Sequence, residues 1–297
     1  MVSELYPFKG KFLNRNDLNY HYLDEGSGET VVMVHGNPTW SFYYRNLVTA
    51  LKDEGYRTIV PDHIGCGLSD KPADSQYEYT LKSRVDDLEA LLEHLELREN
   101  ITLVVHDWGG MIGMAYASRH PERIKRLVVL NTGAFHLPET KKLPLALKIG
   151  RDTQLGSFLI MGLNAFSLVA SHVGCKRNPM SKELRRAYRK PYDCYHNRVA
   201  TLRFVQDIPL APGDASYDLV SEVQDGLQRF ADVPMMICWG ELDFVFDRHF
   251  LAEWRRRFPK AQVHAFADAG HYVLEDAADE VIPLVKEFLA AHPLPAE

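Results

Sequence analysis

The chain has 297 residues, of which 46% are hydrophobic and 25% are charged. This composition is typical of a globular protein with a large apolar core, and it excludes a disordered chain, a collagen and a coiled coil. The formal net charge of −6 leaves no basic excess to neutralise a phosphate backbone. We therefore expect a small-molecule partner and no nucleic-acid partner.

The cysteines and the N-terminal sequence indicate in which cellular compartment the protein resides. The four cysteines are scattered and form no CxxC pair, so the sequence predicts neither a disulfide framework nor a zinc site. The N-terminal stretch MVSELYPFKGKFLN contains Glu4 and no apolar segment of the length that a secretory signal needs. Both features indicate a cytoplasmic protein.

The predicted elements begin with a β-hairpin over residues 11–26, where turn residues interrupt the stretch KFLNRNDLNYHYLDEG. Five apolar runs follow, namely TVVMVHG, RTIVPDHIG, ITLVVHD, RLVVLNT and MMICWGE. Each ends at or next to Gly, Asp or Asn, and helical patterns separate most of them, as expected of strands in a parallel sheet. The clearest helix follows Thr80, where apolar residues recur at spacings of four and three from Leu81 to Leu95. The alternation predicts an α/β fold.

The alternation lapses between residues 135 and 218, which indicates a helical cap inserted into the sheet. The predicted divisions are a first part of the core at residues 1–134, the cap at 135–218 and a second part of the core at 219–297. Within the cap, Thr153 to Cys175 has no Asp, Glu, Lys or Arg. Glycines and serines interrupt this run, which argues against a transmembrane span. A buried cap helix and an apolar lid over a site for long alkyl chains stay open, and the same segment could touch a membrane surface.

The run ITLVVHDWGGMIGMAYA places Asp107 between a buried strand and a helix, the arrangement of a nucleophile elbow. The usual motif is G-x-S-x-G, whereas here Asp107 replaces the serine and Val105 replaces the first glycine. A serine that attacked a saturated carbon would form a stable ether, but a carboxylate forms an ester that water can cleave. Asp107 therefore predicts covalent attack on an sp3 carbon.

A base and an orienting acid should accompany this nucleophile. His271 follows the last predicted strand and completes the chain order of nucleophile, acid and histidine. Asp243 is the preferred acid, because Asp247 directly precedes a helix and is explained as its N-cap. The alternative position after the strand RLVVLNT offers Asn131 and no carboxylate.

Asn37, in HGNPTW, and Trp108 are the candidate donors for the charge of a leaving group. Their side-chain N–H groups could hold a departing anion, and their backbone amides could form an oxyanion hole. All these residues lie at the carboxyl ends of predicted strands, where parallel α/β sheets form their ligand crevices. The proposed steps use only carboxylate, imidazole and N–H donors, so the sequence implies no metal and no organic cofactor.

Five motifs in order, HGNPTWS, PDHIGCGLSDKP, HDWGG, GELDFVF and AGHYVLED, resemble the haloalkane dehalogenase group of the α/β-hydrolase superfamily over nearly the whole chain. The resemblance implies the α/β-hydrolase fold, with a mostly parallel eight-stranded sheet flanked by helices and an inserted helical cap. Epoxide hydrolases are similar at HDWGG, but they usually carry an aromatic residue in place of Asn37. Four tyrosines keep the epoxide hydrolase hypothesis open: Tyr188, Tyr192, Tyr195 and Tyr217.

Within the dehalogenase group, the cap lacks the tryptophan of one branch, since the four tryptophans are Trp40, Trp108, Trp239 and Trp254. The glutamate of a second branch is also missing. The chain resembles the third branch, and most closely its β-lactone decarboxylases of long-chain olefin biosynthesis. That resemblance implies conversion of a cis-β-lactone into a cis-alkene and carbon dioxide, and a multienzyme assembly with other enzymes of the pathway. Haloalkane dehalogenase is the main alternative. Epoxide hydrolase and a non-catalytic ligand receptor are lesser alternatives.

Overall fold

The centre of the molecule is an eight-stranded sheet with the strand order β1-β2-β4-β3-β5-β6-β7-β8. The computed structural model describes residues 2–294. Its strands are β1 (Lys11–Arg15), β2 (Leu18–Gly26), β3 (Glu29–Val34), β4 (Tyr56–Pro61), β5 (Ile101–Asp107), β6 (Ile124–Thr132), β7 (Met235–Gly240) and β8 (Gln262–Phe266). The hairpin β1–β2 joins β4 antiparallel, and the remaining pairs are parallel. The predicted mostly parallel eight-stranded sheet is confirmed.

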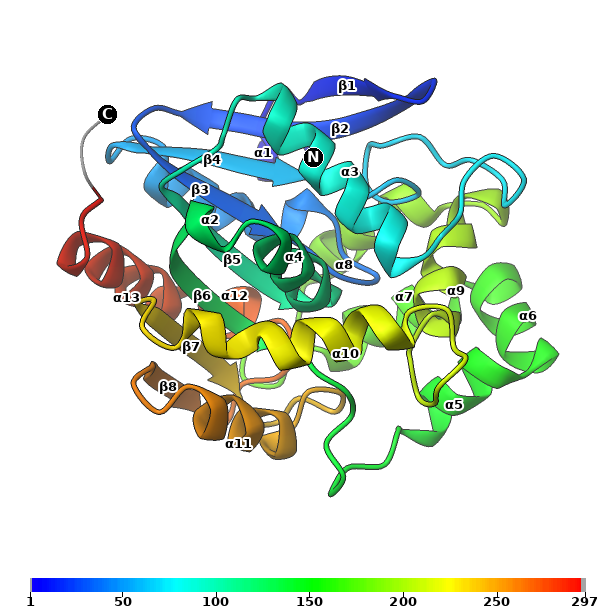
Figure 1. Ribbon diagram of the computed structural model, residues 1–297. Helices are drawn as coiled ribbons and strands as arrows, with labels where there is room; N and C mark the ends of the chain where they lie inside the picture. The colour runs from blue at the N-terminus through cyan, green and yellow to red at the C-terminus, as the bar shows by residue number, and fades with distance from the viewer. Residues whose placement is uncertain (1, 295–297) are drawn as a thin grey trace.

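Helices cover both faces of this sheet (Figure 1). One face carries α3 (Leu81–His94), α4 (Trp108–Arg119), α10 (Tyr217–Gly226) and α11 (Arg248–Arg257). The other carries α2 (Arg45–Leu51), α12 (Val273–Asp276) and α13 (Ala278–Ala291), while α1 (Val2–Leu5) precedes the first strand. Strands covered on both faces need apolar residues at nearly every position, and every residue of β5 is buried.

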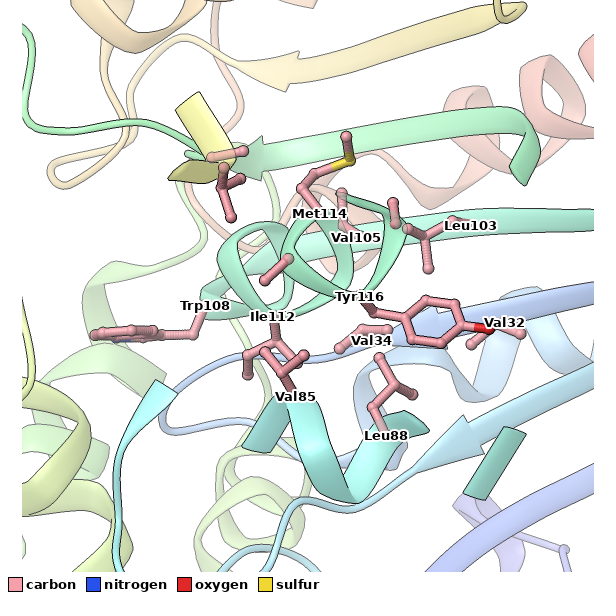
Figure 2. Packing of buried hydrophobic residues seen from close by; sticks show 14 of the residues in the cluster. Val32, Val34, Val85, Leu88, Leu103, Val105, Trp108, Ile112, Met114 and Tyr116 are labelled. Atoms are coloured by element: carbon pink, nitrogen blue, oxygen red, sulfur yellow. The ribbon is translucent and has the colours of Figure 1, made fainter. Parts of the chain in front are cut away.

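The packing around α4 shows how the core fixes the end of β5 (Figure 2). Val85 of α3 lies beside Ile112 of α4, and Val34 of β3 and Val105 of β5 belong to the same buried cluster. At the start of α4, Trp108 belongs to the same cluster, and its ring lies at the edge of the group, to one side of Ile112. The helix therefore anchors one side of the β5–α4 turn in the core and leaves the other side open toward the cap.

The cap follows β6 and consists of α5 (Leu145–Asp152), α6 (Gln154–Leu163), α7 (Ala165–Val173), α8 (Lys182–Arg189) and α9 (Val199–Gln206). In Figure 1 the green helices α5 and α6 lie at the opposite end of the molecule from α13. The next helix, α10, packs against α4 of the core. The cap boundaries at residues 135 and 218 stay predictions.

The uncharged cap segment differs from a single buried helix. Asn164 adopts a left-handed conformation, with φ 52° and ψ 32°, and separates α6 from α7. Large apolar side chains on both helices are exposed. Within residues 2–294 no single helix is long and apolar enough to cross a bilayer, and α6 and α7 reach that length only as a pair bent by 75°.

Candidate active site

Asp107 lies at the sharp turn between β5 and α4. Its backbone has φ 53° and ψ −128°, a strained conformation for a residue other than glycine. Neighbouring glycines permit this turn, because a Cβ added to Gly109 would lie 1.9 Å from the carbonyl oxygen of Val34. A Cβ added to Gly36 would lie 1.9 Å from Oδ1 of Asp107. The backbone therefore brings the Asp107 carboxyl close to the loop after β3.

The two carboxyl oxygens of Asp107 have different surroundings. Oδ1 accepts a hydrogen bond from the backbone N–H of Asn37 at 2.6 Å, whereas Oδ2 faces Nε2 of His271 at 3.7 Å. Burial raises the pKa of Asp107 to about 6, although the charge of His271 and backbone N–H groups oppose this rise. Near neutral pH the group is a carboxylate with one oxygen held and the other free to attack.

His271 is oriented by Asp243 from the loop after β7. Its Nδ1 donates to Oδ2 of Asp243 at 2.8 Å, and both side chains are buried. Burial alone would lower the pKa of His271, but the charge and the hydrogen bond of Asp243, together with the charge of Asp107, outweigh it and raise the pKa. The ring is thus held with Nε2 toward Asp107. The structure brings the three residues of the predicted triad together.

Asn131 contributes to this arrangement in a way that the sequence did not indicate. Its Nδ2 donates to Oδ2 of Asp243 and to the carbonyl oxygen of Gly240, each at 3.0 Å. Its Oδ1 accepts the N–H of Gly240 at 2.8 Å. The residue at the alternative acid position therefore braces the acid. Asp247, in contrast, accepts from the N–H of His249 and caps α11 as predicted.

His106 is a second residue that sequence reasoning missed. Its Nε2 lies 2.9 Å from the carbonyl oxygen of His271, and its ring stacks on Tyr43 at 4.2 Å between centroids. Because a carbonyl oxygen only accepts, Nε2 of His106 must carry the proton. This bond holds the backbone of the catalytic loop. The only signal in the sequence was the position of His106 directly before Asp107 in a buried strand.

The two candidate donors contact the cap helix α9. Nδ2 of Asn37 donates to the carbonyl oxygen of Thr201 at 3.1 Å, and the indole of Trp108 lies 5.4 Å from the ring of Phe204. Both Asn37 and Trp108 line the cavity that contains Asp107. The side-chain amide of Asn37 has two protons, so one remains for a ligand. The cap thus fixes the orientation of both donors.

The cavity has a volume of about 380 Å³ and an almost entirely apolar wall. The polar end of the cavity is formed by four residues of the core, namely Asp107, His271, Asn37 and Trp108. Helices α5 to α7 contribute apolar side chains such as Leu147, Ile160 and Phe166. Within residues 2–294, no group of three or more His, Cys, Asp or Glu is placed to hold a metal ion. The cavity can take a hydrophobic molecule with one polar group.

The four tyrosines that left the epoxide hydrolase hypothesis open do not line this cavity. The hydroxyl of Tyr188 bonds to Glu275, and that of Tyr192 donates to the carbonyl oxygen of Thr39 at 2.8 Å. Tyr195 is exposed and Tyr217 stacks on His136. The cap therefore supplies no hydroxyl from these residues to activate an epoxide.

Comparisons with known proteins agree with this geometry. A family profile described as alpha/beta hydrolase fold matches residues 29–158. The chain is 67% identical to the cis-3-alkyl-4-alkyloxetan-2-one decarboxylase of Shewanella oneidensis, covering 97% of this chain and 91% of that protein. It is 50% identical to the protein of the same name from Xanthomonas campestris, covering 97% and 98%. A haloalkane dehalogenase of Mycolicibacterium paratuberculosis is 33% identical, covering 94% and 91%.

A solved structure of a haloalkane dehalogenase DatA variant from Agrobacterium tumefaciens matches with a TM-score of 0.84 at 25% identity, covering 97% of this chain and 99% of that chain. The fold and the comparisons define the class of the protein as an α/β-hydrolase-fold enzyme. Within this class, the chain belongs to the family that contains these decarboxylases, with haloalkane dehalogenases as its more distant members. The resemblance drawn from the sequence motifs is confirmed.

Proposed function

We propose that this enzyme converts cis-3,4-dialkyl-oxetan-2-ones, which are cis-β-lactones, into cis-alkenes and carbon dioxide in long-chain olefin biosynthesis. The observation that carries the proposal is the free oxygen Oδ2 of Asp107, which faces His271 in a cavity with an apolar wall. The two alkyl chains of the substrate can lie against the apolar wall of the cavity while the lactone ring lies at its polar end. The names of the relatives at 67% and 50% identity support the same substrate class.

In the proposed reaction, Oδ2 of Asp107 attacks the ring carbon that is bonded to the ring oxygen. The carbon–oxygen bond of the ring breaks, and its electron pair leaves with the oxygen as a free carboxylate. The substrate is then bound to Asp107 through an alkyl ester. Loss of carbon dioxide moves an electron pair into the new double bond and expels the Asp107 carboxylate. No water or redox partner is consumed, and the nucleophile is regenerated.

The stereochemistry follows from these two steps. Displacement by Asp107 inverts the configuration of the attacked carbon, and an anti elimination then removes carbon dioxide and the aspartyl group. Inversion followed by anti elimination equals an overall syn loss of carbon dioxide. A cis-lactone therefore yields a cis-alkene.

The remaining site residues act on the charge of the intermediates. In this proposal Asn37 and Trp108, which both line the cavity, donate N–H groups to the carboxylate that ring opening releases. The imidazole of His271, held by Asp243, lies beside the Asp107 carboxyl during attack and expulsion. Its positive form stabilises the carboxylate when Asp107 departs.

Product analysis tests this function. The enzyme is incubated separately with a long-chain cis-β-lactone, a bromoalkane and an epoxide, and products are identified by gas chromatography. We expect cis-alkene from the lactone and no halide release. A diol from the epoxide, or no product from the lactone, would refute the proposal.

Haloalkane dehalogenase activity is the second candidate. It is supported by the dehalogenase at 33% identity and by the pairing of Asn37 with Trp108 as anion donors. In that reaction, water activated by His271 would cleave the Asp107 ester and release an alcohol and a halide. Halide and alcohol from the bromoalkane, with an unreacted lactone, would establish this alternative.

The proposed partner is a small hydrophobic substrate. A multienzyme assembly with other enzymes of the pathway and a cytoplasmic location stay predictions, which co-purification of the tagged chain and cell fractionation would test.

A further inference from the structure

The outer surface of the cap exposes an apolar patch, here named the α5–α7 patch and formed by Leu145, Leu155, Phe158, Leu163, Leu168 and Val169. Leu155, Phe158 and Leu163 are 60%, 59% and 58% exposed, which is unusual for large apolar side chains. They lie on adjoining helices, since α5 packs on α6 and α6 packs on α7. Leu155 and Phe158 are one turn apart on α6 and so share a face.

The cap also differs from the rest of the chain in charge. Residues 135–218 contain thirteen Lys and Arg but seven Asp and Glu, a formal charge of +6 in a chain whose total is −6. The remaining residues therefore carry −12. Positive charge beside an apolar patch is the combination that binds an anionic lipid surface.

The basic residues lie next to the patch. Helix α8 packs against α7, and Arg198 donates to the carbonyl oxygens of Met161 and Gly162 at the end of α6. Several exposed cations of this region have no ion pair within the described chain, namely Lys142, Lys148, Lys182, Arg186 and Lys190. Lys148 lies one turn after Leu145 on α5. These cations remain available to lipid phosphates.

The patch is continuous with the active-site cavity. Val169 is 51% exposed and also lines the cavity. Phe166 and Leu159 of the same helices line it too, at intermediate exposure. The apolar surface of the patch thus continues into the apolar wall of the cavity.

We propose that the α5–α7 patch docks on the surface of an anionic phospholipid bilayer, with its apolar side chains among the acyl chains and the cap cations at the phosphates. The enzyme takes its long-chain substrate from the bilayer and returns the alkene to it. The use of the docked state for catalysis rests on the proposed function, whereas docking itself does not. The bend of 75° between α6 and α7 fits insertion at the surface and not a crossing.

Vesicle sedimentation tests the docking. The full chain is mixed with vesicles of phosphatidylcholine alone or with about one third phosphatidylglycerol, at low salt and at about 0.5 M salt. We expect binding to the anionic vesicles that weakens with salt. Leu155→Ser with Phe158→Ser should weaken it by at least about tenfold, because two apolar anchors are lost. The matched control is Phe12→Ser, which removes an exposed phenylalanine from β1.

A second pair of variants tests the charges. Lys148→Gln with Arg186→Gln should weaken binding by about fivefold for each charge removed. Lys125→Gln with Arg255→Gln removes two exposed cations outside the cap and should leave binding unchanged. Equal losses in both pairs would show that only total charge matters, and would overturn the proposal.

Turnover of a short, dispersed cis-β-lactone is measured for the same proteins. Leu155 and Phe158 do not line the cavity, so their variants should keep this turnover while losing turnover of a long-chain lactone in vesicles. Turnover of the dispersed lactone without vesicle binding overturns only the docking. Vesicle binding without turnover of any lactone overturns only the proposed function. Patch-dependent self-association in sedimentation velocity, without vesicle binding, would assign the patch to a second copy and contradict the proposal.

Discussion

At the scale of single residues, the reactivity of the site depends on opposing effects on Asp107. Burial disfavours its charged form, while the N–H of Asn37 and the charge of His271 favour it. The balance places its pKa at about 6, above the ordinary value but below neutral pH. The carboxylate is therefore poorly solvated and still ionised under neutral conditions, which is the state that a nucleophile requires.

The pH dependence of turnover follows from this pKa. Because Asp107 must be ionised to attack, we expect kcat/KM to fall as the pH drops through about 6. The rate is measured with a dispersed cis-β-lactone between about pH 4.5 and pH 9, and circular dichroism at each pH controls for unfolding. A rate that stays constant down to about pH 4.5 in folded protein would mean that another group is the nucleophile.

Replacement of each carboxylate in turn tests whether Asp243 or Asp247 is the acid that orients His271. Asp243→Asn should lower kcat by about 10²-fold, because His271 loses the charge that raises its pKa and so stabilises the departing Asp107 carboxylate less well. Asp247→Asn is the matched control, since asparagine also caps a helix and this variant should keep nearly full activity. Steady-state kinetics of both variants give the comparison. A larger loss from Asp247→Asn would reverse the assignment.

At the scale of the elements, the sequence allowed the β5–α4 turn and most strands to be predicted, because buried parallel strands leave a strong hydrophobic pattern. The helix after Thr80 was also predictable from its apolar spacing. In the structure the Thr80 side chain caps this helix by accepting a hydrogen bond from the N–H of Ser83. The break between α6 and α7 at Asn164 could not be predicted, since a single left-handed residue between two apolar helices does not change the hydrophobic pattern of the sequence. The bracing by Asn131 and His106 depends on contacts across the sheet, which residue order does not encode.

One contact between elements ties the cap to the catalytic loop. Asp276 is fully buried, and its Oδ2 accepts the N–H groups of Gly270 and Lys176, each at 2.6 Å. Its Oδ1 accepts the N–H of Asn178 at 2.6 Å. Gly270 directly precedes His271, while the other two donors follow α7. The position of the catalytic histidine is therefore coupled to the cap.

Loss of this contact should destabilise the protein. Asp276→Ala leaves three backbone donors without their partner, so we expect a loss of about 3 kcal/mol in unfolding free energy and reduced turnover. Asp279→Ala, at an exposed position on α13, should cost less than about 1 kcal/mol. Chemical denaturation and kinetics measure both. Equal stability of the two variants would show that the Asp276 contacts contribute little.

At the scale of the whole molecule, the cap and the core meet over a buried ion pair as well as over the active site. Arg84 of α3 is fully buried and donates to Oδ2 of Asp207, which follows α9, at 3.1 Å. Its guanidinium also lies 3.7 Å from the ring centroid of Phe204. Because Phe204 packs on Trp108, this pair supports the cap wall next to a candidate donor.

Removal of one charge of the buried Arg84–Asp207 pair should destabilise the protein. Asp207→Asn leaves the Arg84 guanidinium without a countercharge, and we expect a loss of about 3–5 kcal/mol in unfolding free energy. Arg84→Met with Asp207→Leu removes both charges and should recover much of that loss. Chemical denaturation of the single and double variants measures the difference. A double variant less stable than Asp207→Asn would refute this account of the interface.

The central claim is that Asp107 forms the covalent bond to the substrate. The most direct measurement is the rate of cis-alkene formation from a cis-β-lactone by the wild type and by Asp107→Asn, with circular dichroism to verify the fold. We expect one cis-alkene per lactone consumed by the wild type, and a rate at least about 10⁴-fold lower for the variant, whose amide is a far weaker nucleophile. Alkene formation by Asp107→Asn at the wild-type rate would contradict the account.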